Sequence, residues 1–222
     1  MRNKFVLCSC LLIAASSLSA NPVEATFTGV NGMVAFNNYV GPYNGTLAGD
    51  AVTLYCVDFN NEVSFGEDWM ANLSHIDTKS NLANTRYGGI MNSVTLYQEA
   101  AWLTEQYALN PTSAYADIQA TIWQLFDPFA PTPSSSYWLT QSQSHYASAD
   151  FSKFVVVTNV GPVTRTGQVQ EFLTVINPSN SIESLDNPQP VPETALAGVI
   201  GIALVGFVFG VRCLRRPGSR SA

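Results

Sequence analysis

Only one of the four cysteines, Cys56, lies outside the two hydrophobic ends of the chain. Cys8 and Cys10 belong to the N-terminal apolar run, and Cys213 follows the C-terminal one. A thiolate is the strongest common side-chain nucleophile, so an isolated cysteine is a candidate reactive group. The alternative is a small buried hydrophobe with an inert thiol. Outside the cytoplasm an unpaired thiol is exposed to oxidation, so export of the chain would favour a chemical role.

Residues 1–25 are typical of a secretory signal peptide. Arg2 and Lys4 supply the positive start, and residues 5–15 form an apolar run too short to span a bilayer. Cleavage is predicted after Ala20 or Ala25, and the second site fits the small-x-small pattern better. The sequence therefore predicts export.

A second apolar segment precedes the C-terminus. Residues 195–211 carry no charge, and extending the segment to 194–214 gives enough length for one transmembrane helix. Four arginines follow from position 212 onward. By the positive-inside rule, residues 215–222 form a short basic cytoplasmic tail and the body of the chain lies outside.

Residues 26–176 are the predicted folded domain, and residues 177–193 form a linker rich in Pro, Asn and Ser. Residues 26–187 contain fourteen acidic and four basic residues, a net charge of about −10. This balance argues against nucleic acid and anionic membrane surfaces as partners. Lys79 and Lys153 are the only lysines in this stretch.

Short runs broken by turn residues predict β-structure in the first part of the domain. The predicted strands cover residues 25–30, 33–36, 51–57, 154–158 and 168–176. Asn44-Gly45 is predicted to form a hairpin turn, and residues 69–87 are predicted to form a loop. Alternation places Leu54 and Cys56 on one face of their strand, which points Cys56 inward if that face packs in the core.

Three helices are predicted between these two groups of strands. They cover residues 93–107, 110–126 and 135–147, the second opening at Asn110-Pro111 and ending at Asp127-Pro128. The order strands, helices, strands predicts an α+β fold, with a helical insertion in a β-barrel or sandwich-like scaffold. Trp102, Trp123 and Trp138 are expected to lie in the core, and so is Tyr55.

Two predicted helices share the pattern Gln-x-x-apolar-Trp, at Gln98 to Trp102 and at Gln119 to Trp123. Residues 55–58, 97–103 and 117–123, with Gln-Glu-Phe at 170–172, resemble the thioester domains of bacterial surface proteins. In that family a strand cysteine and a helix glutamine form an internal thioester. The resemblance implies that Cys56 and Gln119 form this bond, with Gln98 as the rival acyl donor.

Condensation of a thiol with a carboxamide releases ammonia, and it requires both groups to be held together away from water. Trp123 and Phe126 are expected to shelter the pair on the helix side. Tyr55 and Asp58 flank Cys56, and Asp58 is expected either to orient a nearby group or to cap a turn with the asparagines that follow it. The product stores an acyl group that an amine can attack.

Other chemistries have weaker support. The pattern Asp58-x-Asn60-x-Glu62 suggests a calcium loop, but Val63 stands where such a loop requires glycine. The two histidines have no ligand-type neighbours at metal-binding spacing, so neither a metal site nor any cofactor is expected. They also lack a motif for a Cys-His or Ser-His hydrolase.

The tail resembles the PEP-CTERM sorting signal of Gram-negative bacteria. Val191-Pro192-Glu193, the apolar segment and the arginines follow that pattern, whereas Thr194 replaces its second proline. The resemblance implies processing by an exosortase-like enzyme. It also implies anchoring in the inner membrane with a periplasmic domain, followed by release to the cell surface or extracellular matrix.

The sequence therefore predicts an adhesin-like surface protein that forms one covalent amide link to an amine-bearing partner, such as a protein lysine or a polyamine. A group that reacts once is not a turnover enzyme. Two alternatives remain open. One is a non-reactive structural or matrix protein of the same fold. The other is a carbohydrate-binding module that uses exposed tryptophans such as Trp69 or Trp138.

Overall fold

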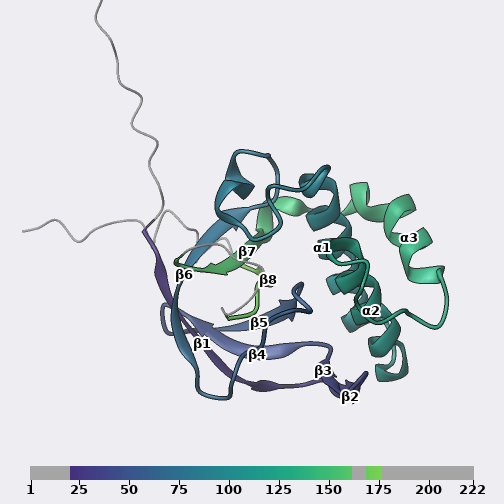
Figure 1. The fold of residues 1–222 in the computed structure, drawn as a ribbon, viewed down its shortest axis with the longest axis horizontal. Coiled ribbons are helices and arrows are strands. Elements are labelled where there is room, and N and C mark those ends of the chain that lie inside the picture. The colour runs from purple at the N-terminus through teal and green to yellow at the C-terminus, as the bar shows by residue number, and fades with distance from the viewer. Residues whose placement is uncertain (1–20, 162–168, 177–222) are drawn as a thin grey trace, which may run out of the picture. The chain divides into compact units, whose positions relative to one another are not determined.

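Six antiparallel strands close into a barrel in the computed structural model, which describes residues 21–161 and 169–176 (Figure 1). The described residues all belong to one unit within Met1–Ser184. The barrel strands are β1 (Val23–Val30), β4 (Tyr43–Leu47), β5 (Asp50–Cys56), β6 (Asp68–His75), β7 (Phe154–Asn159) and β8 (Phe172–Val175), in the order β1-β4-β5-β8-β7-β6. β2 (Met33–Ala35) and β3 (Asn38–Val40) form a separate hairpin. The predicted α+β fold on a β-barrel scaffold is confirmed.

The hairpin turn predicted at Asn44-Gly45 is wrong, because both residues lie inside β4 and pair with β5. The turn is at Ala48-Gly49, where both residues have positive φ (51° and 89°), as this tight hairpin requires. Gly45 serves close packing instead. A Cβ there would lie 2.5 Å from Leu54 Cδ1 and 2.7 Å from the carbonyl oxygen of Thr26.

The loop predicted over residues 69–87 is also wrong in its first part, since β6 covers Asp68–His75 and pairs with both β1 and β7. Its polar residues Asn72 and Ser74 hide the strand pattern. The apolar side chains of Trp69, Ala71 and Leu73 alternate and pack in the barrel core. β8 begins at Phe172, later than residue 168.

Three helices, α1 (Ser93–Leu109), α2 (Tyr115–Phe126) and α3 (Tyr137–His145), are inserted between β6 and β7. The predicted start of the second helix at Pro111 is wrong. Pro111 is extended and precedes a single 3-10 turn at Thr112–Ala114, so α2 begins only at Tyr115. Its predicted end is confirmed, because Asp127 is the extended C-cap residue and Pro128 follows.

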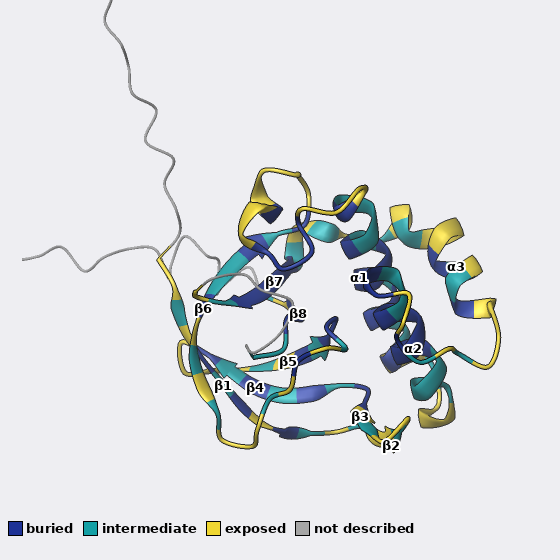
Figure 2. Cartoon of the chain, viewed as in Figure 1, coloured by how far each residue is buried: buried dark blue, intermediate teal, exposed yellow. Residues whose placement is uncertain are grey.

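Two apolar cores meet where α2 faces the barrel, and the barrel-facing side of the helices is the buried one (Figure 2). One core joins the helices to the outside of β7 and β8. The other fills the barrel and contains Leu54, Cys56 and Phe172, together with Trp123 from α2. A large aromatic side chain from the insertion therefore completes the barrel core next to Cys56.

The predicted linker (177–193), sorting residues Pro192 and Glu193, transmembrane segment (194–214) and tail (215–222) lie outside the described residues. So do residues 1–20 of the predicted signal peptide. β1 begins at Val23, three residues before the predicted start of the domain. In residues 21–161 and 169–176, no helix has the length and hydropathy of a membrane span.

Candidate thiol–carboxamide site

Cys56 is the last residue of β5 and is fully buried. The inward orientation predicted from strand alternation is confirmed, since Leu54 and Cys56 both pack in the barrel core. The thiol donates a hydrogen bond to the carbonyl oxygen of Asp58 (3.2 Å). The indole N–H of Trp123 donates to Cys56 Sγ over 3.4 Å. The sulfur is thus held between a backbone acceptor and an indole donor.

Gln119 lies on α2 and is also fully buried. Its Nε2 donates a hydrogen bond to the backbone carbonyl oxygen of Cys56 (2.7 Å). The structure therefore brings together the cysteine and the glutamine that the family resemblance pairs. Trp123 follows Gln119 by four residues, so both side chains leave the same face of α2 and reach Cys56.

Two donors hold the carbonyl oxygen of the Gln119 side chain. The Tyr107 hydroxyl donates to Oε1 over 3.0 Å, and the Gly41 backbone N–H donates over 3.4 Å. A pair of donors on one carbonyl oxygen polarises the carbonyl carbon, and it stabilises the negative charge that develops when a nucleophile attacks that carbon. The Gln119 side-chain carbonyl is thus polarised by two donors, while its amino group separately contacts the backbone carbonyl oxygen of Cys56.

Neither Tyr107 nor Gly41 was predicted from the sequence to belong to the site. Gly41 adopts φ +103°, and a Cβ there would lie 2.8 Å from Tyr115 Cδ2, so glycine is required on both grounds. Tyr107 ends the apolar stripe of α1 and stacks on Tyr55, with ring centroids 5.7 Å apart. The sequence signals were a Gly-Pro pair and a helical tyrosine, and each also has an ordinary structural explanation.

Burial raises the pKa of the Cys56 thiol from 9.0 to about 12, and the nearby charge of Asp58 adds to the rise. The hydrogen bond from Trp123 opposes it by favouring the thiolate. At neutral pH the free sulfur is therefore a neutral thiol. An acylated sulfur carries no charge either, so this apolar site suits a thioester better than it suits a thiolate.

Gln98 is placed elsewhere. It lies on α1, and its Nε2 donates to the carbonyl oxygen of Ile76 over 3.2 Å. Trp102, the matching residue of its pattern, stacks on His145 instead of reaching Cys56. The geometry separates the two glutamines, because of the two only Gln119 hydrogen-bonds Cys56 in the part of the chain that the structure describes.

Asp58 caps the turn that follows β5, as one of its two predicted roles required. Its carboxylate accepts hydrogen bonds from the Asn60 N–H and the Asn61 side chain. It also forms a buried ion pair with Arg86, whose NH1 lies 2.9 Å from Asp58 Oδ2, and it accepts a bond from the Tyr87 hydroxyl. These contacts fix the carbonyl group that the Cys56 thiol contacts.

Glu171, in the segment before β8, extends this buried network. Its side-chain carboxylate accepts hydrogen bonds from the backbone N–H of Arg86, the Thr158 hydroxyl and the Tyr97 hydroxyl. Burial raises the pKa of Glu171 above its usual range. The backbone carbonyl oxygen of Glu171 accepts a hydrogen bond from the Val57 N–H, and this bond anchors the end of β5.

The remaining predicted supporting residues lie one layer away from the sulfur. Phe126 packs against Tyr87 and Tyr97, with ring centroids 4.9 and 4.8 Å apart. Tyr55 is half-buried on the opposite face of β5 and stacks on Tyr107. Phe126 therefore belongs to the helical core, and of the two α2 residues predicted to shelter the site only Trp123 hydrogen-bonds Cys56 in the described part of the chain.

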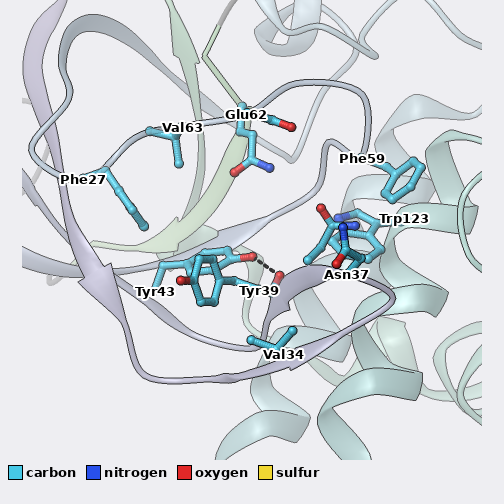
Figure 3. Close-up of a pocket in the computed structure, with 11 residues that line it drawn as sticks. Phe27, Val34, Asn37, Tyr39, Tyr43, Phe59, Glu62, Val63 and Trp123 are labelled. Atoms are coloured by element: carbon cyan, nitrogen blue, oxygen red, sulfur yellow. Dashed lines mark hydrogen bonds between the residues drawn. The ribbon is translucent and has the colours of Figure 1, made fainter.

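A pocket of about 360 Å³ opens beside this site (Figure 3). Side chains of the β2–β3 hairpin line one side, and Phe59, Glu62 and Val63 from the segment after β5 line another. Trp123 forms part of its wall. The Trp123 indole also donates to Cys56 Sγ, so this side chain contacts both the pocket and the sulfur.

No protein-family model, curated protein or solved structure matches the chain.

Proposed function

We propose that Cys56 Sγ and the side-chain carbonyl carbon of Gln119 form an internal thioester, which then forms one covalent amide link to an amine-bearing partner. The observation that carries the proposal is the arrangement of Gln119. Its amino group donates to the backbone carbonyl oxygen of Cys56, and its own carbonyl oxygen has two donors.

The proposed reaction proceeds in one displacement. The sulfur attacks the carbonyl carbon of Gln119, and the charge that develops on Oε1 is stabilised by Tyr107 and Gly41. The carbon–nitrogen bond breaks, and the thiol proton leaves with the amino group as ammonia. Trp123 stabilises negative charge on the sulfur in this step and again when an amine later displaces it.

The two lysines in the described residues are both engaged away from this site, which supports storage of an amine-reactive group. Lys153 pairs with Glu105 over 2.7 Å. Lys79 donates to the Ile90 carbonyl and the Ser93 hydroxyl. Self-reaction within the domain is thereby disfavoured. In this proposal the chain is an exported, adhesin-like surface protein, and the partner is a protein lysine or a polyamine.

Intact mass of the mature full chain tests the bond. Wild type is expected to be lighter than its sequence mass by one ammonia, and Cys56→Ala should lose this deficit. Gln98→Ala is the matched control and should retain it, because Gln98 does not contact Cys56. A full-mass wild type with a titratable thiol would contradict the proposal.

One observation favours a second function, a non-reactive structural protein of the same fold. Cys56 is fully buried among apolar side chains with a raised thiol pKa, as an inert core cysteine would be. The same mass measurement separates the two. A platform of exposed tryptophans has less support, because Trp138 is buried and Trp69 stacks on Phe172.

A further inference from the structure

The pocket beside Trp123 has one carboxylate in its lining. Glu62 is exposed and makes no hydrogen bond or ion pair within the described part of the chain. In Figure 3 it lies across the pocket from Val34, with Trp123 and Phe59 to one side. The other ionisable groups in the lining are the phenols of Tyr39 and Tyr43, and Tyr43 donates to the carbonyl oxygen of Tyr39. A free carboxylate therefore sets the charge of this pocket.

The remaining walls suit an aliphatic cation. Phe59 packs on Trp123 with ring centroids 5.1 Å apart, and Tyr39 faces the same space. Aromatic faces attract ammonium groups, and they also pack against methylene chains. An anionic or strongly polar ligand would find no cationic partner here.

The side chains at the rim of the pocket indicate which kind of molecule presents the cation. Val34 is 63% exposed and Phe65 is 60% exposed, and Phe65 packs against both Phe27 and Tyr39. Large apolar side chains around a pocket mouth are typical of surfaces that a protein partner covers. A small free amine would leave them in water.

We propose that Glu62 is a specificity-determining residue that selects the ammonium group of a lysine side chain, presented by an apolar-flanked segment of a protein partner. This inference rests on the proposed thioester. The pocket guides the amine along the aromatic walls to Trp123, beyond which the Cys56 sulfur lies.

The reaction balances within this site. The ammonium first releases one proton to water, and the free amine nitrogen attacks the carbonyl carbon of Gln119. The nitrogen lone pair forms the carbon–nitrogen bond, and the π pair of the carbonyl group moves to Oε1, between Tyr107 and Gly41. This pair re-forms the carbonyl group as the carbon–sulfur bond breaks. The Cys56 thiolate leaves beside the Trp123 N–H and takes the second proton from nitrogen. The products are an amide and a thiol.

The test compares nucleophiles on the mature full chain, followed by intact mass. Hydroxylamine is small and uncharged at pH 7, cadaverine is a free alkylammonium, and the peptide acetyl-Leu-Lys-Leu-amide presents lysine between apolar residues. Glu62→Gln should slow the peptide and cadaverine reactions by about fivefold, the upper range for an exposed ion pair, and leave hydroxylamine unchanged. Added salt should reproduce the effect in wild type.

Glu67→Gln is the matched control. It makes the same charge change in the same segment, but Glu67 bonds to the Ser64 N–H and does not line the pocket. If hydroxylamine opens the bond, but Glu62→Gln and Glu67→Gln change the peptide and cadaverine rates equally or not at all, Glu62 does not determine specificity. If the peptide reacts more slowly than cadaverine, the amine does not come from a lysine of a protein partner. If wild type has full mass and hydroxylamine changes nothing, the thioester itself is absent.

Discussion

In the proposed chemistry, the Gln119 carbonyl depends most on its hydrogen bond from the Tyr107 hydroxyl. This hydroxyl lies 3.0 Å from Oε1, whereas the Gly41 N–H lies 3.4 Å away, at the long end of the hydrogen-bond range. Tyr107→Phe removes the shorter donor and leaves the ring stacked on Tyr55. Loss of one such donor commonly slows acyl transfer by about 10²–10³-fold, so we expect the thioester to open at least about 100-fold more slowly.

The effect on stability should be much smaller. Gln119 Oε1 keeps the Gly41 donor in the variant, so the loss is one neutral hydrogen bond, about 1 kcal/mol. Opening is measured by intact mass at intervals after adding hydroxylamine, and stability is measured by urea unfolding. Thioester formation should slow as well, and it is followed during refolding under reducing conditions.

Tyr115→Phe is the control for Tyr107→Phe. The Tyr115 ring packs edge-on against Tyr107 and its hydroxyl donates to the Tyr107 carbonyl oxygen, so the variant disturbs the same cluster without touching Gln119. It should open at close to the wild-type rate. If Tyr107→Phe forms the bond and opens it as fast as wild type, the two-donor role assigned to Tyr107 and Gly41 is refuted.

Two further predictions concern the thiol and the start of the mature chain. After opening with methylamine, Cys56 should react with iodoacetamide at pH 8 about a thousandfold more slowly in the folded protein than in urea, because burial raises its pKa from 9.0 to about 12. Comparable alkylation rates in the folded protein and in urea would contradict this raised pKa. Because the folded state then favours the protonated thiol, the contribution of Cys56 to the free energy of unfolding should be complete below pH 9 and decline as pH rises towards 12. N-terminal sequencing should find Asn21 first, because cleavage after Ala25 would remove β1 residues that pair with Ala71, Met70 and Trp69. A chain beginning at Thr26 would show that the barrel tolerates this loss.

The sequence was most informative where one residue type has one dominant use. Strand alternation in β5 predicted that the Cys56 side chain points inward, and helical spacing placed Gln119 and Trp123 on one face of α2. It misled where a residue type has two uses. Asn44-Gly45 is a strong turn pair, yet Gly45 is a close-packing position inside β4.

The part of the site that could not be predicted comes from contacts far apart in the chain. Gly41 is 78 positions from Gln119, and nothing local indicates that its N–H points at a helix side chain. Glu62 similarly belongs to a pocket that exists only once the β2–β3 hairpin and α2 are both in place. Such positions depend on tertiary structure, whereas local patterns report only secondary structure and its faces.

The placement of the helices has a consequence for folding. β6 and β7 are neighbours in the barrel, and His75 pairs with Val155, although α1, α2 and α3 lie between them in the chain. Contacts of such long sequence separation form slowly, since their loop-closure entropy must be overcome before they stabilise the chain. Cys56 precedes the insertion and Gln119 lies within it, so the pair is assembled only after the insertion docks on the barrel. In the proposed chemistry, loss of ammonia is thus a permanent record that a given molecule has reached its native topology, and a misfolded molecule keeps its original mass.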